Sequence, residues 1–126
     1  MNKLQTVPKW IIAYLWIITI ITFMLSMLAY INPAIQFPGF AEIGALSLAG
    51  PLGFFVARNV ATGVTTAFAL INGTVNALMT AFVLRAVTDG MDFVHSVIVG
   101  NFPLAIFAFA LCAIEIIALI KLKKLN

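Results

Sequence analysis

The chain has 126 residues, of which 63% are apolar and 9% are charged. A soluble domain usually carries about 25% charged residues, so this composition argues against a soluble monomer and indicates an integral membrane protein. One cysteine and one histidine exclude an internal disulfide, a paired-thiol redox site and a haem held by two histidines of one chain. No cofactor and no metal site are predicted, and the net charge of +3 is no sign of a nucleic-acid partner.

Four long apolar segments follow one another along the chain. A helix needs about 20 mainly apolar residues to cross the hydrocarbon core of a bilayer. Asn32-Pro33 ends the first segment, a proline- and glycine-rich connection over 33–51 follows it, and the turn dipeptide Asn72-Gly73 separates the second segment from the third. The predicted spans are therefore about 10–31, 52–71, 74–97 and 104–120.

Lysines flank the first and last segments, at Lys3 and Lys9 and at 121–124. Cytoplasmic flanks of membrane helices carry an excess of lysine and arginine, which places both termini in the cytoplasm. An even number of crossings requires the same arrangement. We therefore predict an all-α, four-helix transmembrane bundle that forms a single domain over 1–126, crosses the cell membrane several times and has the lipid bilayer as its surroundings.

Charged side chains interrupt the last three segments near their middles, at Arg58, Arg85, Asp89 and Glu115. A charge that faces lipid costs about 2.5–3.5 kcal/mol on translocon scales, so such residues usually turn into a bundle and find partners. Counting at 1.5 Å per residue from the two short turns places Arg58 within about 3 Å in depth of Arg85 and Asp89, with Glu115 in the same layer. We predict one polar layer with no net charge, Arg58 and Asp89 as a candidate direct pair, and Asp92 on its outer side.

Helical spacing also predicts which faces pack. Arg85, Asp89 and Asp92 are spaced i, i+4, i+7 and share one stripe. Small residues let membrane helices approach closely, so Ala61/Thr65/Ala69, Ala108/Cys112 and the hydroxyl patch Thr19/Thr22/Ser26 are predicted to lie between helices. Aromatic side chains such as Trp10, Tyr14, Trp16 and Tyr30 are predicted to lie in interfacial belts or against lipid. The candidate ligand-binding residues are Arg58, Asn59, Thr62, Arg85, Asp89, Asp92, His95 and Glu115.

The motif R-N-V-A-T-G at 58–63, followed by R-A-V-T-D-G-M-D at 85–92, resembles small uncharacterised four-helix membrane-protein families of bacteria and fungi. Their pattern is Arg-Asp/Asn-x-x-x-Gly in the second helix and Arg-x-x-x-Asp in the third. The resemblance implies a four-helix topology and a role for Arg58, Arg85 and Asp89. It implies no catalytic activity.

Three functions fit these observations. In a binding or transport protein, Arg58 and Arg85 bind an anionic group of a small ligand and Asp89 or Glu115 carries a proton; a homodimer is expected, because four helices are few for a transporter. In an intramembrane enzyme, Glu115 and Asp89 are the candidate acid and base for isomerisation or cyclisation of a lipid-soluble substrate. In a structural or accessory subunit, the charges guide assembly. A fully paired cluster favours the structural role.

Overall fold

The computed structural model describes residues 6–32 and 51–125, so the predicted connection over 33–51 lies almost entirely outside the described residues. The described chain is all-helical and contains four helices, each beginning and ending within one turn of a predicted segment. They are α1 (Lys9–Ile31), α3 (Pro51–Asn72), α4 (Val75–Ile98) and α5 (Phe102–Lys123).

Local signals explain where these helices stop. Gly73 and Gly100 take φ angles of 62° and 74°, the left-handed conformation that ends a helix at little cost only when the residue is glycine. Thr74 then caps α4, because its hydroxyl accepts a hydrogen bond from the backbone N–H of Ala77 at 3.2 Å. Asn101 caps α5 in the same way, through the N–H of Leu104 at 3.3 Å.

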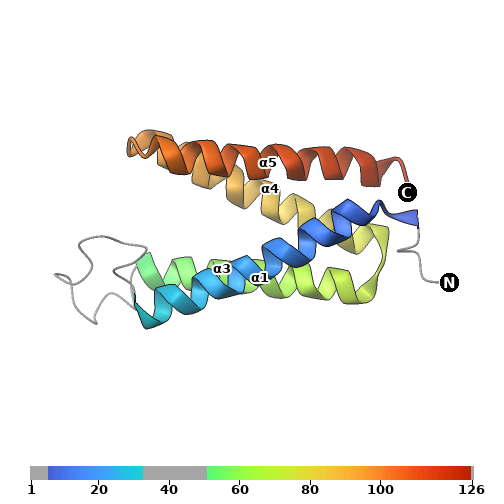
Figure 1. Cartoon of the computed structure of the whole chain (residues 1–126), viewed down its shortest axis with the longest axis horizontal. Helices are drawn as coiled ribbons and strands as arrows, with labels where there is room; N and C mark the ends of the chain where they lie inside the picture. Colours follow the sequence, from blue (N-terminus) through green and yellow to red (C-terminus); the bar gives the residue numbers. More distant parts are fainter. Residues whose placement is uncertain (1–5, 33–50, 126) are drawn as a thin grey trace.

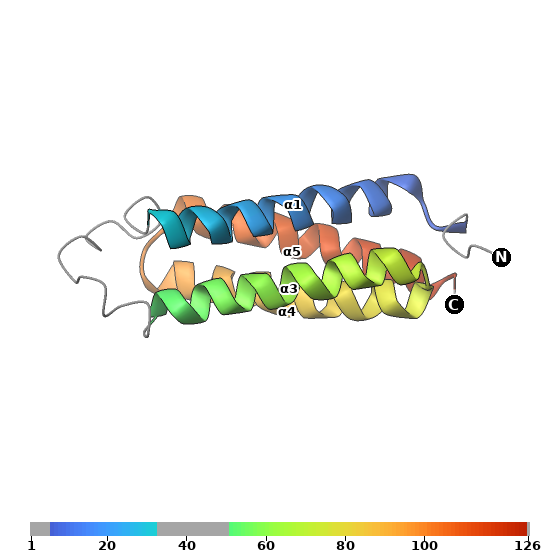
Figure 2. The same ribbon diagram turned by 90° about the horizontal axis from the view of Figure 1, so that it is seen from below.

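The helices run alternately up and down, and both ends of the described chain lie at the end of the bundle that carries the Gly73 turn (Figure 1). We call this the terminal end, and the opposite end, with the Gly100 turn, the loop end. The closest packing is between α4 and α5, between α1 and α3, and between α3 and α4. The α1/α3 pair and the α4/α5 pair lie close together at the terminal end and separate toward the loop end (Figure 1), and a view turned by 90° shows α1 above α3 along their length (Figure 2).

Three of the described helices are long and apolar enough to cross a membrane, over Lys9–Ile31, Gly53–Asn72 and Phe102–Lys123. Large apolar side chains are exposed around the bundle, including Ile17, Phe68 and Ile106 at 59%, 65% and 71%. These features indicate a membrane protein. Helix α4 has 24 residues but carries Arg85, Asp89 and Asp92, which lower its hydropathy.

The interior has two different halves. A continuous apolar core lies toward the terminal end. Its buried members are Val7, Ile11, Leu15, Ala69, Leu70, Val75, Leu78, Ala81, Phe82, Ala118 and Leu122. Buried polar side chains occupy the middle of the bundle and extend toward the loop end. We call the buried hydroxyl residues of the described helices the polar lane: Thr19, Thr22, Ser26, Thr62, Thr66 and Ser96.

The predicted packing face Ala61/Thr65/Ala69 is correct for Ala69 and wrong for Ala61. Ala61 is exposed and Thr65 is half-buried, whereas Thr62, Thr66 and Ala69 are buried. Helix α3 is therefore rotated about its axis relative to the prediction. Its hydroxyl side faces the bundle, and Thr66 satisfies its hydroxyl by donating to the Thr62 carbonyl at 2.7 Å. The predicted Ala108 and Thr19/Thr22/Ser26 positions are buried.

Candidate functional site

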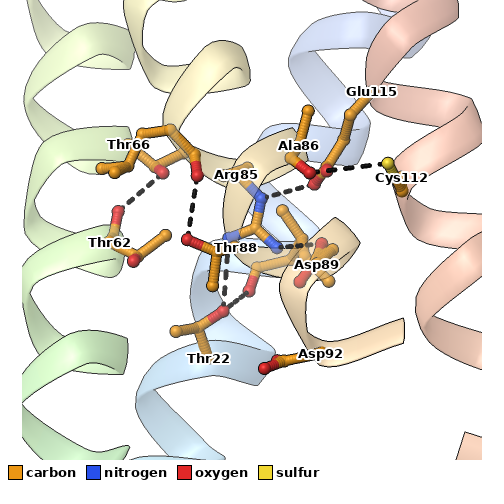
Figure 3. A network of polar contacts seen from close by, with 12 residues as sticks. Thr22, Thr62, Thr66, Arg85, Ala86, Thr88, Asp89, Asp92, Cys112 and Glu115 are labelled. Atoms are coloured by element: carbon orange, nitrogen blue, oxygen red, sulfur yellow. Dashed lines mark hydrogen bonds and ion pairs between the residues drawn. The ribbon is translucent and has the colours of Figure 1, made fainter. Parts of the chain in front are cut away.

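Arg85 is the centre of the polar interior, where it joins three helices (Figure 3). Its Nε donates a 2.8 Å hydrogen bond to Oε1 of Glu115 on α5. Its Nη2 lies 3.6 Å from Oδ2 of Asp89, one turn further along α4. Its Nη1 lies 3.5 Å from the hydroxyl of Thr22 on α1. The guanidinium thus holds two carboxylates from a buried position, which its planar set of donors suits.

Tyr14 is a further member of this centre, and the prediction that it faces an interface or lipid is wrong. Its hydroxyl donates a 2.9 Å hydrogen bond to Oε1 of Glu115. Its ring stacks on Phe82, with 6.0 Å between centroids and 13° between planes. A fully buried carboxylate needs more than one hydrogen-bond donor, and this need was the one sign in the sequence that Glu115 has a partner besides arginine. The spacing of residues along α1 does not reveal which aromatic side chain supplies the second donor.

The two oxygens of Glu115 have different surroundings. Oε1 accepts from both Arg85 and Tyr14, whereas the buried Oε2 has no hydrogen-bond partner among the described residues. Oδ2 of Asp89 is also buried and accepts no hydrogen bond there, although it lies near the Arg85 cation. Buried polar atoms are usually satisfied, so an open carboxylate oxygen in a protein interior needs an explanation.

The formal charge of this inner group is unbalanced. Arg85 contributes +1, and Asp89 and Glu115 contribute −1 each when ionised, so the group carries 1 − 2 = −1. An uncompensated buried charge is costly because it has lost its hydration. The inner group of Arg85, Asp89 and Glu115 is therefore suited to hold one further positive charge.

Arg58 does not join the inner group, and the prediction of a single layer with Arg58 beside Asp89 is wrong in this respect. Arg58 instead donates two parallel hydrogen bonds, of 2.6 and 3.0 Å, to the carboxylate of Asp92. The Arg58 guanidinium lies over the Phe55 ring, with Cζ of Arg58 5.6 Å from the ring centroid. Depth along the helices is similar for Asp89 and Asp92, but the bidentate geometry and the rotation of α3 favour Asp92.

The other predicted site residues have different positions. Thr62 is buried next to Arg58 and donates its hydroxyl proton to the Arg58 carbonyl at 2.8 Å. Asn59 is half-buried on α3, and His95 is exposed near the loop end of α4. Cys112 is partly buried where α5 meets α4, with its Sγ 3.5 Å from the Ala86 carbonyl. Within the described part of the chain, neither Asn59 nor His95 forms a side-chain hydrogen bond or ion pair with the inner group.

Two hydroxyl groups of the polar lane resemble the open carboxylate oxygens. Thr19 and Ser96 are 3% and 1% exposed, and neither side-chain oxygen has a hydrogen-bond partner among the described residues. Thr22 and Ser26 instead donate to carbonyls of their own helix, at 2.7 and 2.8 Å. The lane therefore offers oxygen atoms with unused hydrogen-bonding capacity on both α1 and α4.

Within the described residues, no three His, Cys, Asp or Glu side chains are grouped so that they could hold a metal ion. An apolar hollow lies between α4 and α5 near the loop end, away from the charges, and is lined by Phe93, Val97, Phe102, Ala105, Ile106 and Phe109.

No protein-family model, curated protein or solved structure matched this chain. The resemblance of residues 58–63 and 85–92 to small four-helix membrane families stays a prediction.

Proposed function

We propose that this protein is a multi-pass protein of the cell membrane that binds a proton at its Asp89–Glu115 carboxyl pair and uses it in transport of protons or of a small ligand. All four helices cross the bilayer in this proposal, including α4, whose charges turn inward. Both termini lie in the cytoplasm, because the lysines at 3, 9 and 121–124 flank the first and last crossings. A homodimer stays a prediction from the small number of helices.

The observation that carries the proposal is the open Oε2 of Glu115. This side chain is 0% exposed, and its other oxygen already accepts two hydrogen bonds. A purely structural ion pair would leave no such atom, because each buried acceptor would be matched to a donor. A proton on Oε2 of Glu115 or on Oδ2 of Asp89 supplies the missing donor and brings the inner group to zero net charge.

Groups from other helices contact the two carboxyl groups that would share this proton. Tyr14 of α1 donates to Glu115 of α5, and Arg85 of α4 holds both carboxylates. The two carboxyl groups also interact electrostatically with each other. When two carboxyl groups share a site, they titrate as a pair, and the first proton is shared between them. Such a pair can accept and release one proton without moving a helix.

Infrared spectroscopy of the protein in liposomes tests the proposal, because a protonated carboxyl has a carbonyl stretch separate from that of a carboxylate. The chain has four acidic residues, so the band can be assigned by substitution. We expect a protonated-carboxyl band at neutral pH that disappears in Glu115→Gln combined with Asp89→Asn. Glu42→Gln, in the predicted connecting loop, is the control and should leave the band unchanged. A wild-type protein without the band at neutral pH would contradict the proposal.

A further inference from the structure

We infer that protons reach the inner group from the loop end alone, and that the Arg58–Asp92 ion pair obstructs that route between Ser96 and the inner group. This inference rests on the proposed function of the Asp89–Glu115 pair. It adds the direction of access and two residues that control it.

The terminal side of the inner group is closed by the apolar core. Tyr14 and Phe82 stack directly beside Glu115, and Phe82 is 0% exposed. One turn beyond Glu115 on α5, Ala118 is fully buried in the same core. Between Thr66 or Glu115 and the terminal end, every buried side chain among the described residues is apolar, so this part of the interior offers no buried side-chain donor or acceptor to a proton or to a water molecule. The described residues thus supply no buried polar side chain for proton transfer beyond Thr66 and Glu115 toward the terminal end.

The loop side of the inner group is lined by oxygen atoms. Thr22 contacts Arg85, and Ser26 follows one turn further toward the loop end on α1. Ser96 lies one turn beyond Asp92 on α4, buried and with an unsatisfied hydroxyl. Hydroxyl oxygens can both donate and accept, which is what a chain of water molecules or proton transfers needs.

Exposure of the charged side chains rises steadily along this direction. Glu115 and Arg85 are 0% and 4% exposed, Asp89 is 14% exposed, and Asp92 and Arg58 are 35% and 37% exposed. The half-exposed Arg58–Asp92 pair therefore lies between the surroundings and the inner group. It bridges α3 and α4, and Thr62, bonded to the Arg58 carbonyl, lies one turn inward from it. Breaking this pair exposes the lane without touching the inner group.

Cysteine labelling tests the route. In a Cys112→Ala background, Thr62→Cys and Ala69→Cys form a matched pair, because both positions lie on α3 and are 4% and 2% exposed. The first lies in the polar lane and the second in the apolar core. A charged, membrane-impermeant methanethiosulfonate is added to either side of sealed vesicles, and Lys124→Cys marks the side of the terminal end. Circular dichroism confirms that each variant is folded.

We expect Thr62→Cys to react from the side opposite to Lys124→Cys, and Ala69→Cys to react from neither side. Adding Arg58→Ala should speed the reaction of Thr62→Cys roughly fivefold, since a partly exposed ion pair contributes about 1 kcal/mol to the closed state, and leave Ala69→Cys unchanged. If Thr62→Cys does not fold, Ser26→Cys replaces it with the same expectation.

The inference is overturned if the lane cysteine reacts from the terminal side, if Ala69→Cys reacts as fast as the lane cysteine, or if Arg58→Ala has no effect on the rate. These outcomes are separate from the infrared test. Labelling from both sides, with an intact protonated-carboxyl band, would reject the one-sided route and leave the proposed function standing. Labelling from one side only, without the band, would reject the proposed function and leave the one-sided access of the polar lane standing.

Discussion

Arg85 and Glu115 form a 2.8 Å ion pair in an interior where their side chains are 4% and 0% exposed. The pair joins α4 to α5 at the boundary between the apolar core and the polar lane. It occupies one oxygen of Glu115 and leaves the other open. The same contact therefore fixes two helices and leaves an atom available for chemistry.

The Arg85–Glu115 pair should show strong energetic coupling. Glu115→Ala leaves a buried, partly unpaired guanidinium, so we expect it to destabilise the bundle by about 3–5 kcal/mol. In an Asp89→Asn background, combining Arg85→Met with Glu115→Leu should recover most of this loss, because the inner group then carries no charge. Unfolding of the single and double variants in detergent measures the coupling. Additive effects of the two single substitutions would contradict direct pairing.

Arg58 should couple to Asp92 and not to Asp89. Its two hydrogen bonds go to the carboxylate of Asp92, at 2.6 and 3.0 Å. In double-mutant cycles on unfolding in detergent, Arg58→Ala with Asp92→Ala should show coupling, and Arg58→Ala with Asp89→Ala should show little. The Arg58–Asp92 coupling should be smaller than that of Arg85–Glu115, since this pair is more than a third exposed. Equal coupling to both aspartates would argue for a single shared cluster.

The Tyr14 hydroxyl should stabilise the fold through Glu115. Tyr14→Phe keeps the ring that stacks on Phe82 and removes one of the two donors to Oε1. A hydrogen bond to a charged group contributes about 1.5–3 kcal/mol, and we expect a loss in that range. Tyr30→Phe is the matched control, because Tyr30 is 64% exposed, and it should leave the unfolding temperature unchanged. Equal effects of the two variants would remove Tyr14 from the site.

Helix α3 packs on α1 through Gly63. A Cβ atom at Gly63 would lie 3.0 Å from the Phe23 ring, so Gly63→Leu should overpack this contact and cost about 1–3 kcal/mol. Ala61→Leu inserts the same side chain two residues away at an exposed position and should be nearly neutral in detergent. Gly90→Ala is a second control, since a Cβ there meets Cys112 Sγ at an ordinary 3.7 Å. A larger loss in Ala61→Leu than in Gly63→Leu would show that the packing face of α3 is misassigned.

The proposed topology predicts where reporters lie. Fusions after Lys124 should report the cytoplasm, and fusions within 37–45 should report the opposite side. The reason is the lysine flanks of the first and last helices together with four crossings. Reporters on the same side would mean that one of the four helices does not cross, and α4, with its three charges, would be the first candidate.

The sequence alone determined quantities that are measured along the chain. Apolar runs interrupted by Asn32-Pro33, by Gly73 and by Gly100 located all four described helices to within one turn, because helix ends depend on local backbone chemistry. The rise per residue was sufficient to place Arg85, Asp89 and Glu115 at neighbouring depths, since a helix is close to straight over such a distance.

Only the tertiary structure decided what depends on rotation and reach. The rotation of α3 about its axis left Ala61 exposed, kept the predicted Thr62 in the interior and brought Arg58 to Asp92. The long side chain of Tyr14 reached Glu115 across the bundle, a contact between residues 101 positions apart. Periodicity leaves such choices open, because small and hydroxyl residues on adjacent faces are nearly equal in hydropathy. Packing of one helix on another selects among them, and that selection left Oε2 of Glu115 open beside the apolar core.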